Sequence, residues 1–186
     1  MDLDRFRLFQ KRYGVCQVIP EWQTFFEFIT AYFSNRGISR PIVVELGTER
    51  NHQKQFFEEF LNARHIGIDQ SDRHGKPDIV GDAFSPETVE TLKTMLDGEP
   101  INLLMAELDS PYENAVQSYN IFGQMTKNIV SFHSVCTPNG GVQRFWQELC
   151  DTQDEYVKLT LFNQHPPGHE YYKVRMGKGV LIKEWR

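Results

Sequence analysis

The sequence predicts an α/β fold built around a mostly parallel sheet, and three observations support this prediction. Short apolar runs of strand length alternate along the chain with segments whose apolar residues recur at helical spacing. Carboxylates, a glycine and a histidine follow directly on several of the apolar runs, as expected at the carboxyl edge of a parallel sheet. The chain of 186 residues is also long enough for one domain with a well-filled core.

The composition is that of an ordinary globular protein and argues against several other classes. A formal net charge of -5 provides no overall basic surface, so a nucleic-acid partner is not expected. No apolar run approaches the about 20 residues of a membrane span, and residues 1–14 lack the apolar core of a signal peptide. The widely spaced Cys16, Cys136 and Cys150 predict reduced thiols, a cytoplasmic location and no cysteine-built zinc site.

Five segments have the apolar spacing of helices. In the first, Pro20 is suited to the first turn and Gly37 is a stop signal, while aromatic residues between them recur every three or four positions. The predicted helices are residues 20–36, 52–63, 86–97, 113–125 and 141–150. We expect residues 1–37 to form a helical segment that packs on a single domain spanning residues 1–186.

Seven short apolar runs predict the strands of the sheet. They are residues 42–46, 65–69, 78–82, 101–107, 128–133, 156–162 and 179–183. A long excursion containing Pro166, Pro167 and Gly168 separates the last two runs, so we expect these two strands to pair antiparallel.

Polar residues gather where five of these strands end. They are Glu45 with Gly47, Asp69, Asp82, Glu107 with Asp109, and His133. Ligands of an open α/β sheet bind outside the carboxyl ends of its strands. These residues are therefore expected to converge on one crevice, although they are far apart in the sequence.

The turn after the first strand has a single glycine, Gly47, where a phosphate-binding loop has two or three. A dinucleotide site would show GxGxxG and a P-loop would show Lys followed by Ser or Thr, so the turn favours a cofactor without a phosphate and disfavours a nicotinamide enzyme. Gly47 could let the backbone approach a ligand, while Glu45 could orient the loop or accept an ammonium group. The alternative is a turn that needs glycine only for its geometry.

The ends of the second and third strands suggest contacts with a nucleoside. Asp69 could accept hydrogen bonds from a ribose diol, or it could be a solvated acid or a cap. Asp82 and Ala83 could flank an adenine ring through the carboxylate or a backbone amide, or they could form only the turn before the helix that begins near Pro86.

The fourth and fifth strands end in groups suited to acid–base or metal chemistry. Glu107 and Asp109 could share a divalent cation or supply a general base, and otherwise they are solvated loop acids. His133 could be a base or a metal ligand, or a packed and hydrogen-bonded core residue. No HxxxH or HxH pair occurs, and we interpret His65 as structural.

In combination these segments resemble class I S-adenosylmethionine-dependent methyltransferases. Within that class they look like the branch of cephalosporin-hydroxylase-like proteins and sugar O-methyltransferases. The resemblance runs from about residue 17 to the end of the chain. Its landmarks are QVIPEW (17–22), VVELGT (43–48), GID (67–69), GD (81–82), NLLMAELDSPYE (102–113), IVSFHSV (129–135), GVQRFWQEL (141–149) and GKGVLIK (177–183).

The resemblance implies a Rossmann-like three-layer sandwich whose seven-stranded sheet has an antiparallel last strand. It implies S-adenosylmethionine as cofactor, Mg²⁺ near the acceptor, and methylation of a hydroxyl on a small molecule or sugar, with Asp109 or His133 as base. Glu107, Asp109 and His133 would hold the metal. The expected cofactor-binding residues are Glu45, Gly47, Thr48, His52, Asp69, Gln70, Asp82, Ala83 and Glu107.

The sequence departs from the family pattern at three sites, of which the first is the end of the fourth strand, where the acids remain in kind but the family's histidine is absent. The family turn continues with a glycine pair and a serine, whereas this chain has Asn51, His52 and Gln53. Their side chains would crowd the carboxylate end of the cofactor, or would replace backbone contacts with their own. The fifth strand ends in His133 and Ser134, so an expected carboxylate ligand is missing. The alternative function is therefore a catalytically silent relative that binds a ligand or a protein partner. A chain this compact leaves little room to cover an acceptor, and a homodimer partner could provide that cover.

Overall fold

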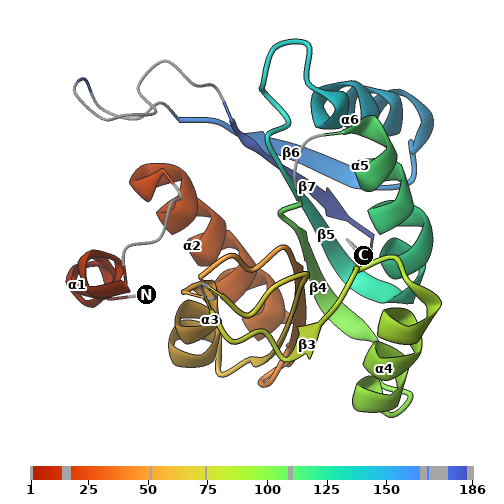
Figure 1. The fold of residues 1–186 in the computed structure, drawn as a ribbon. Helices are drawn as coiled ribbons and strands as arrows, with labels where there is room; N and C mark the ends of the chain where they lie inside the picture. The colour runs from red at the N-terminus through yellow and green to blue at the C-terminus, as the bar shows by residue number, and fades with distance from the viewer. Residues whose placement is uncertain are drawn as a thin grey trace.

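The seven predicted strands form a single sheet with helices on both faces (Figure 1). The computed structural model describes residues 2–13, 18–50, 52–73, 75–108, 111–163, 167 and 176–183. The strand order is β3-β2-β1-β4-β5-β7-β6. Neighbouring strands from β3 to β5 are parallel, and β7 runs antiparallel to both β5 and β6. The predicted Rossmann-like sandwich with an antiparallel last strand is therefore confirmed.

The strands lie close to their predicted positions. They are β1 Ile42–Leu46, β2 Arg64–Asp69, β3 Ile79–Val80, β4 Ile101–Ala106, β5 Thr126–His133, β6 Val157–Leu161 and β7 Lys178–Ile182. Only β3 is much shorter than the predicted run, because the chain turns away after it. The Asp82 carboxylate accepts a hydrogen bond from the Phe84 amide at 3.0 Å and so forms a local turn toward the next helix.

The helices cover the two faces of the sheet. They are α1 Leu3–Tyr13, α2 Ile19–Asn35, α3 Gln53–Leu61, α4 Pro86–Leu96, α5 Tyr112–Ser118 and α6 Gly141–Thr152, with a π-helical turn η1 at Tyr119–Gly123. The predicted helix over 113–125 is present, but within it the chain widens from α5 into the π-helical turn η1. Gly123 lies so close to the ring of Tyr119 that a Cβ would be 2.9 Å from its Cδ2. None of the described helices is long and apolar enough to cross a bilayer.

Helix α1 was not predicted as a separate element. The Asp2 side chain accepts hydrogen bonds from the amides of Asp4 and Arg5, both at 3.1 Å, and so satisfies donors at the start of the helix. Phe6, which is fully buried, attaches the helix to the rest of the protein. The spacing of Phe6, Phe9 and Tyr13 is helical, and this was the signal that could have identified α1 from the sequence.

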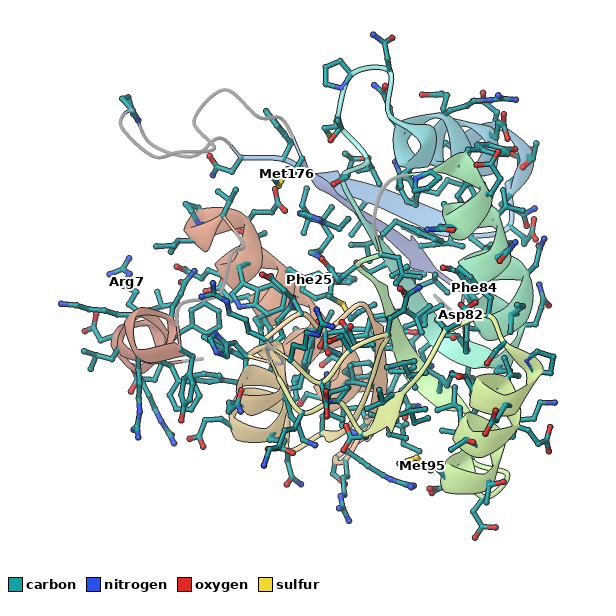
Figure 2. The ribbon with its side chains drawn as sticks, in the orientation of Figure 1. Arg7, Phe25, Asp82, Phe84, Met95 and Met176 are labelled. Carbon is teal, nitrogen blue, oxygen red and sulfur yellow. The ribbon has the colours of Figure 1, made fainter. Side chains whose placement is uncertain are left out.

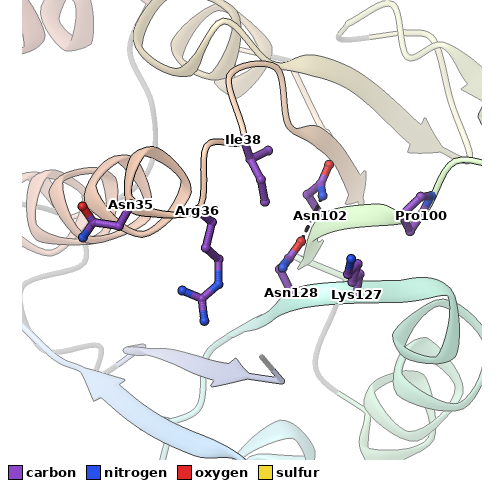
Figure 3. A pocket seen from close by; sticks show the side chains of 7 residues that line it. All are labelled: Asn35, Arg36, Ile38, Pro100, Asn102, Lys127 and Asn128. Atoms are coloured by element: carbon purple, nitrogen blue, oxygen red, sulfur yellow. Dashed lines mark hydrogen bonds between the residues drawn. The ribbon is translucent and has the colours of Figure 1, made fainter. Parts of the chain in front are cut away.

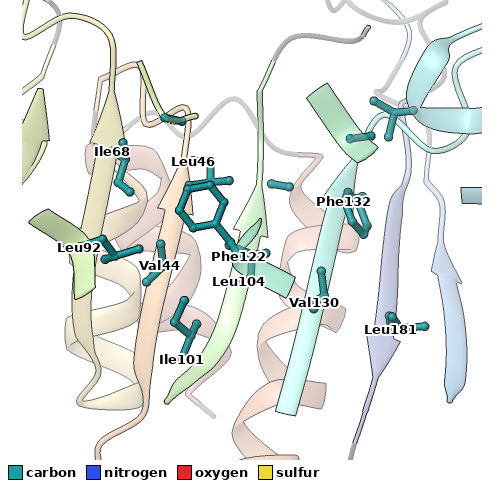
Figure 4. Close-up of a cluster of buried hydrophobic side chains, with 14 of the residues drawn as sticks. Val44, Leu46, Ile68, Leu92, Ile101, Leu104, Phe122, Val130, Phe132 and Leu181 are labelled. Carbon is teal, nitrogen blue, oxygen red and sulfur yellow. The ribbon is translucent and has the colours of Figure 1, made fainter. Parts of the chain in front are cut away.

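Two hydrophobic clusters lie on opposite faces of the sheet. Along β1, Val44 and Leu46 belong to the cluster under α4, α5 and α6, whereas Val43 belongs to the cluster under α1, α2 and α3. Figure 4 shows the first cluster, where the Phe122 ring lies among Leu46 and Leu104 of the strands. Because both faces are covered, β1 and β4 are apolar almost throughout rather than alternating.

Candidate functional site

The carboxyl edge of the sheet brings together residues from four strands. Strands β1, β4 and β5 end there, and β7 begins there because it runs in the opposite direction. In the register of the antiparallel pair, Lys178 at the start of β7 is the partner of His133 at the end of β5. The sheet therefore adds Lys178, which the sequence analysis did not name, to the predicted site.

A buried ion pair lies at the centre of this edge. Lys178 Nζ donates to Glu107 Oε1 at 2.5 Å, and the two side chains are 0% and 5% exposed. On the other side of the carboxylate, His133 Nδ1 lies 3.6 Å from Glu107 Oε2. The predicted pair of Glu107 and His133 is thus brought together, with an ammonium group as its third member. Asp109, also predicted here, lies outside the described residues.

The Lys178 side chain lies against helix α2. Its ammonium is 5.7 Å from the ring centre of Trp22 and 5.4 Å from that of Phe25, in cation–π arrangements. Glu21 of the same helix is also buried, and its Oε2 accepts a hydrogen bond from the Asn163 amide at 3.3 Å. Burial raises the pKa of Glu21, while Lys178 and the Asn163 amide oppose this shift.

His133 is held in its neutral form by its surroundings. Burial lowers its pKa, the Glu107 carboxylate offsets part of this effect, and the Lys178 ammonium adds to it. With a pKa below the usual value of about 6.5, the imidazole is unprotonated at neutral pH. Its side chain remains 22% exposed, so a ring that can accept a proton is accessible at this edge.

A second buried pair supports the turn after β1. Glu45 Oε2 and His65 Nε2 lie 2.7 Å apart and both side chains are 0% exposed. The His65 ring stacks on Phe57, with ring centres 5.6 Å apart. Burial raises the pKa of Glu45, and the hydrogen bond to His65 opposes that shift. The Glu45 carboxylate is therefore buried below the surface of the carboxyl edge, and it would act on a ligand only through neighbouring residues.

The turn after β1 packs Gly47 tightly against the backbone of Glu107. Its φ is +82°, and a Cβ there would lie 3.1 Å from the Glu107 carbonyl oxygen. Beside it, Thr48 Oγ1 and Gln53 Oε1 are buried and have no hydrogen-bond partner among the described residues. His52 precedes α3 without a side-chain cap, and Asn51 lies outside the described residues. The turn thus contains two buried polar atoms without a hydrogen-bond partner among the described residues.

Asp69 at the end of β2 joins two turns. One carboxylate oxygen accepts the Glu49 amide at 2.9 Å and the other accepts the Ser71 amide at 3.0 Å. Gln70 beside it is exposed, and the loop continues to Gly75, whose Cβ would lie 2.7 Å from the backbone of Arg50. The predicted proximity of Asp69 to the first turn is present, and its carboxylate already carries two hydrogen bonds.

At the end of β3 the Asp82 side chain bonds to a residue close to it in the sequence and, among the described residues, not to another strand. Ala83 is buried, and the Asp82 side chain, which is exposed, bonds to the amide of Phe84 (Figure 2). Asp82 and Phe84 lie between the sheet and the start of α4. The predicted contact of Asp82 and Ala83 with an adenine stays a prediction.

A pocket of about 530 Å³ lies at the opposite edge of the sheet, where β4 and β5 begin (Figure 3). Its lining residues are Asn35, Arg36, Ile38, Pro100, Asn102, Lys127 and Asn128. Asn102 and Asn128 bond to each other at 2.9 Å. None of the predicted site residues lines this pocket, so the carboxyl edge is the site that the sequence indicated.

Gly47→Ala is expected to destabilise the protein more than Gly98→Ala. The two glycines have nearly the same φ, +82° and +81°, but a Cβ at Gly98 meets nothing within 4 Å. The Gly98 variant should lose about 1–2 kcal/mol from the left-handed backbone alone, and the Gly47 variant should lose more because of the clash with Glu107. Urea unfolding of both variants measures the difference. Equal losses would show that the turn can move away from Glu107.

Comparisons with known proteins support the same fold. The matching solved structures include cofactor-bound Rv0187 from MTB, with 13% identity, a TM-score of 0.64, and coverage of 98% of this chain and 89% of that chain. The O-methyltransferase TomG from Streptomyces achromogenes, solved in complex with SAM, has 12% identity, a TM-score of 0.58, and coverage of 97% and 88%.

The MycE methyltransferase of the mycinamycin pathway, solved with Mg, SAH and mycinamycin VI, has 12% identity and a TM-score of 0.63. The match covers 97% of this chain and 53% of MycE, so this chain spans about half of that protein. No protein-family model and no curated protein matches the sequence. At these identities the comparisons establish the class I methyltransferase fold.

Proposed function

We propose that this protein is an S-adenosylmethionine-dependent O-methyltransferase acting on a hydroxyl of a small molecule or sugar. The observation that carries the proposal is the turn after β1. There, a Cβ at Gly47 would crowd Glu107, Thr48 Oγ1 has no hydrogen-bond partner among the described residues, and Asp69 approaches from β2. The fold similarity to TomG and MycE supports it. We also propose that residues 1–186 act as a single domain, with residues 1–37 packed upon it.

We assign each residue of the edge a role toward the cofactor. Gly47 and Thr48 would meet its amino-acid end, since the unpartnered Thr48 and Gln53 oxygens match a group rich in donors and acceptors. Asp69 would hold the ribose, with Gln70 beside it and His52 bordering the turn. The remaining expected contacts are Asp82 and Ala83 at the adenine. Glu45 and Glu107 would act from beneath, since both side chains are buried.

His133 is the proposed proton acceptor. S-adenosylmethionine supplies an electrophilic methyl group when bound, and the protein must remove a proton from the acceptor hydroxyl. His133 is neutral at pH 7, partly exposed, and next to the Glu107 carboxylate, which would stabilise the imidazolium after proton transfer. Asp109 remains a second proposed base. The acceptor hydroxyl would have to lie within hydrogen-bond distance of the imidazole, because proton removal requires that contact.

Asp69→Ala is expected to weaken S-adenosylmethionine binding by about 10- to 100-fold, the loss of hydrogen bonds to a charged group. Calorimetric titration of the purified protein with S-adenosylmethionine and S-adenosylhomocysteine measures this change. Asp72→Ala is the matched control, because Asp72 is an exposed acid in the same loop. We expect this control to bind like the wild type.

The same titration decides between the proposal and its alternative. Micromolar binding that depends on Asp69 would support the methyltransferase and justify a search for acceptors. Absence of binding at millimolar ligand would refute it and favour the catalytically silent relative. In that case the amides of Glu49 and Ser71 would be the permanent partners of the Asp69 carboxylate.

A further inference from the structure

We propose that the Lys178 ammonium takes the place of a divalent cation at the carboxyl edge of the sheet, so that the site functions without a bound metal. The resemblance led us to expect Mg²⁺ beside Glu107, Asp109 and His133. Of these three residues the structure describes Glu107 and His133, and their arrangement does not fit that ion. Glu107 is already bound to a buried cation of the protein's own, through the 2.5 Å contact to Lys178 Nζ.

A metal ion on this carboxylate would have to bind beside the ammonium. A divalent cation lies about 2.0–2.6 Å from its oxygen ligands. An ion bound to Oε1 of Glu107 would therefore lie within about 5 Å of Nζ, and the two positive charges would repel each other in a poorly solvated place. Among the residues that the structure describes, no three His, Cys, Asp or Glu side chains are grouped as a metal site.

Lys178 cannot easily move aside to admit a metal ion. Its side chain is 0% exposed and lies against the rings of Trp22 and Phe25. It is also bracketed by two glycines that the structure requires. Gly177 has a φ of +71° and a Cβ there would meet the side chain of Cys136, while a Cβ on Gly179 would lie 2.8 Å from the Trp146 ring. The backbone on both sides of the lysine is thus held in place.

Lys178 would perform two tasks that the expected cation would otherwise perform. It neutralises Glu107, and by bonding to Oε1 it turns Oε2 toward His133, 3.6 Å away. Lys178 is therefore a positioning residue, acting through Glu107 on the imidazole. The positioning of Glu107 toward His133 matters only if the proposed function is correct, whereas the exclusion of a metal ion does not depend on that function.

The test is a Mn²⁺ titration of the full chain, followed by paramagnetic broadening of backbone amide signals. In the wild type we expect no broadening centred on Glu107 and His133 up to millimolar Mn²⁺. Localised broadening there at lower Mn²⁺ would overturn the proposal. Because this measurement uses neither cofactor nor acceptor, it stands even if the proposed methyltransferase activity fails.

Removing the ammonium should create the metal site. We expect Lys178→Ala to bind Mn²⁺ at least tenfold more tightly than the wild type and to show a higher Tm with Mn²⁺, while the double variant Lys178→Ala with Glu107→Gln shows neither effect. A folded Lys178→Ala variant without this gain would overturn the idea that lysine replaces a metal. If that variant does not fold without metal, recovery of folding by Mn²⁺ supports the proposal, and the wild-type titration remains decisive.

Discussion

Lys178→Met is expected to lower the free energy of unfolding by about 3–5 kcal/mol, the usual cost of leaving one member of a buried ion pair without its partner. Methionine has a similar length and keeps the contacts with Trp22 and Phe25, so the loss reports on the charge. The Glu107 carboxylate, only 5% exposed, would then have lost its ammonium partner. Urea unfolding at pH 7 measures the change.

Two comparisons make this prediction specific. Lys54→Met breaks a pair with Asp78 at 2.9 Å whose side chains are both 25% exposed, and it should cost no more than about 1 kcal/mol. The double variant Lys178→Met with Glu107→Gln should be less destabilised than the sum of the single variants, because neither charge is left alone. Strictly additive losses would show that the two groups do not stabilise each other.

Phe26→Ala is expected to cost about 3–5 kcal/mol, which is the range for removing a buried aromatic side chain. Phe26 is 0% exposed and contacts rings from three helices. Its centroid distances are 5.5 Å to Phe6 of α1, 4.7 Å to Trp22 of α2 and 5.1 Å to Phe57 of α3. Thermal and urea unfolding followed by circular dichroism measure the loss.

The control for this variant is Phe162→Ala, because Phe162 is 46% exposed. It should change stability by no more than about 0.5 kcal/mol. If residues 1–37 and the sheet form one domain, near- and far-ultraviolet signals of the Phe26 variant will change in a single transition at the same urea concentration. Two separate transitions would show that the N-terminal helices unfold independently, and would contradict the proposed single domain.

The sequence was most informative where periodicity and topology agree. The runs of β1 and β4 are apolar enough to be recognised alone, and the antiparallel pairing of β6 and β7 followed from the long excursion between them. The ends of the helices and strands were less predictable. The length of β3 depends on the Asp82 turn, and the length of α5 depends on the packing of Gly123 against Tyr119. Those contacts are visible only in three dimensions.

The site was predicted in outline but not in its pairings. Glu107 and His133 were expected to meet and do so. Lys178 was missed because its place depends on the β5–β7 register, in which it faces His133 from the far end of the chain. Likewise, His65 was interpreted as structural and is buried, but its bond to Glu45 joins two strands that no spacing rule links. Long-range pairings of this kind are not encoded in local patterns.

The position of β7 determines the order in which the site can be completed during synthesis. The ribosome releases β6 before β7, yet in the strand order of the described residues β6 pairs with the sheet through β7. Until residues 178–182 emerge, the edge of β5 is unpaired and can associate with other nascent chains. The same residues carry the ammonium that neutralises Glu107. A translational pause before them would therefore leave a partly folded chain with an open sheet edge and an uncompensated acid.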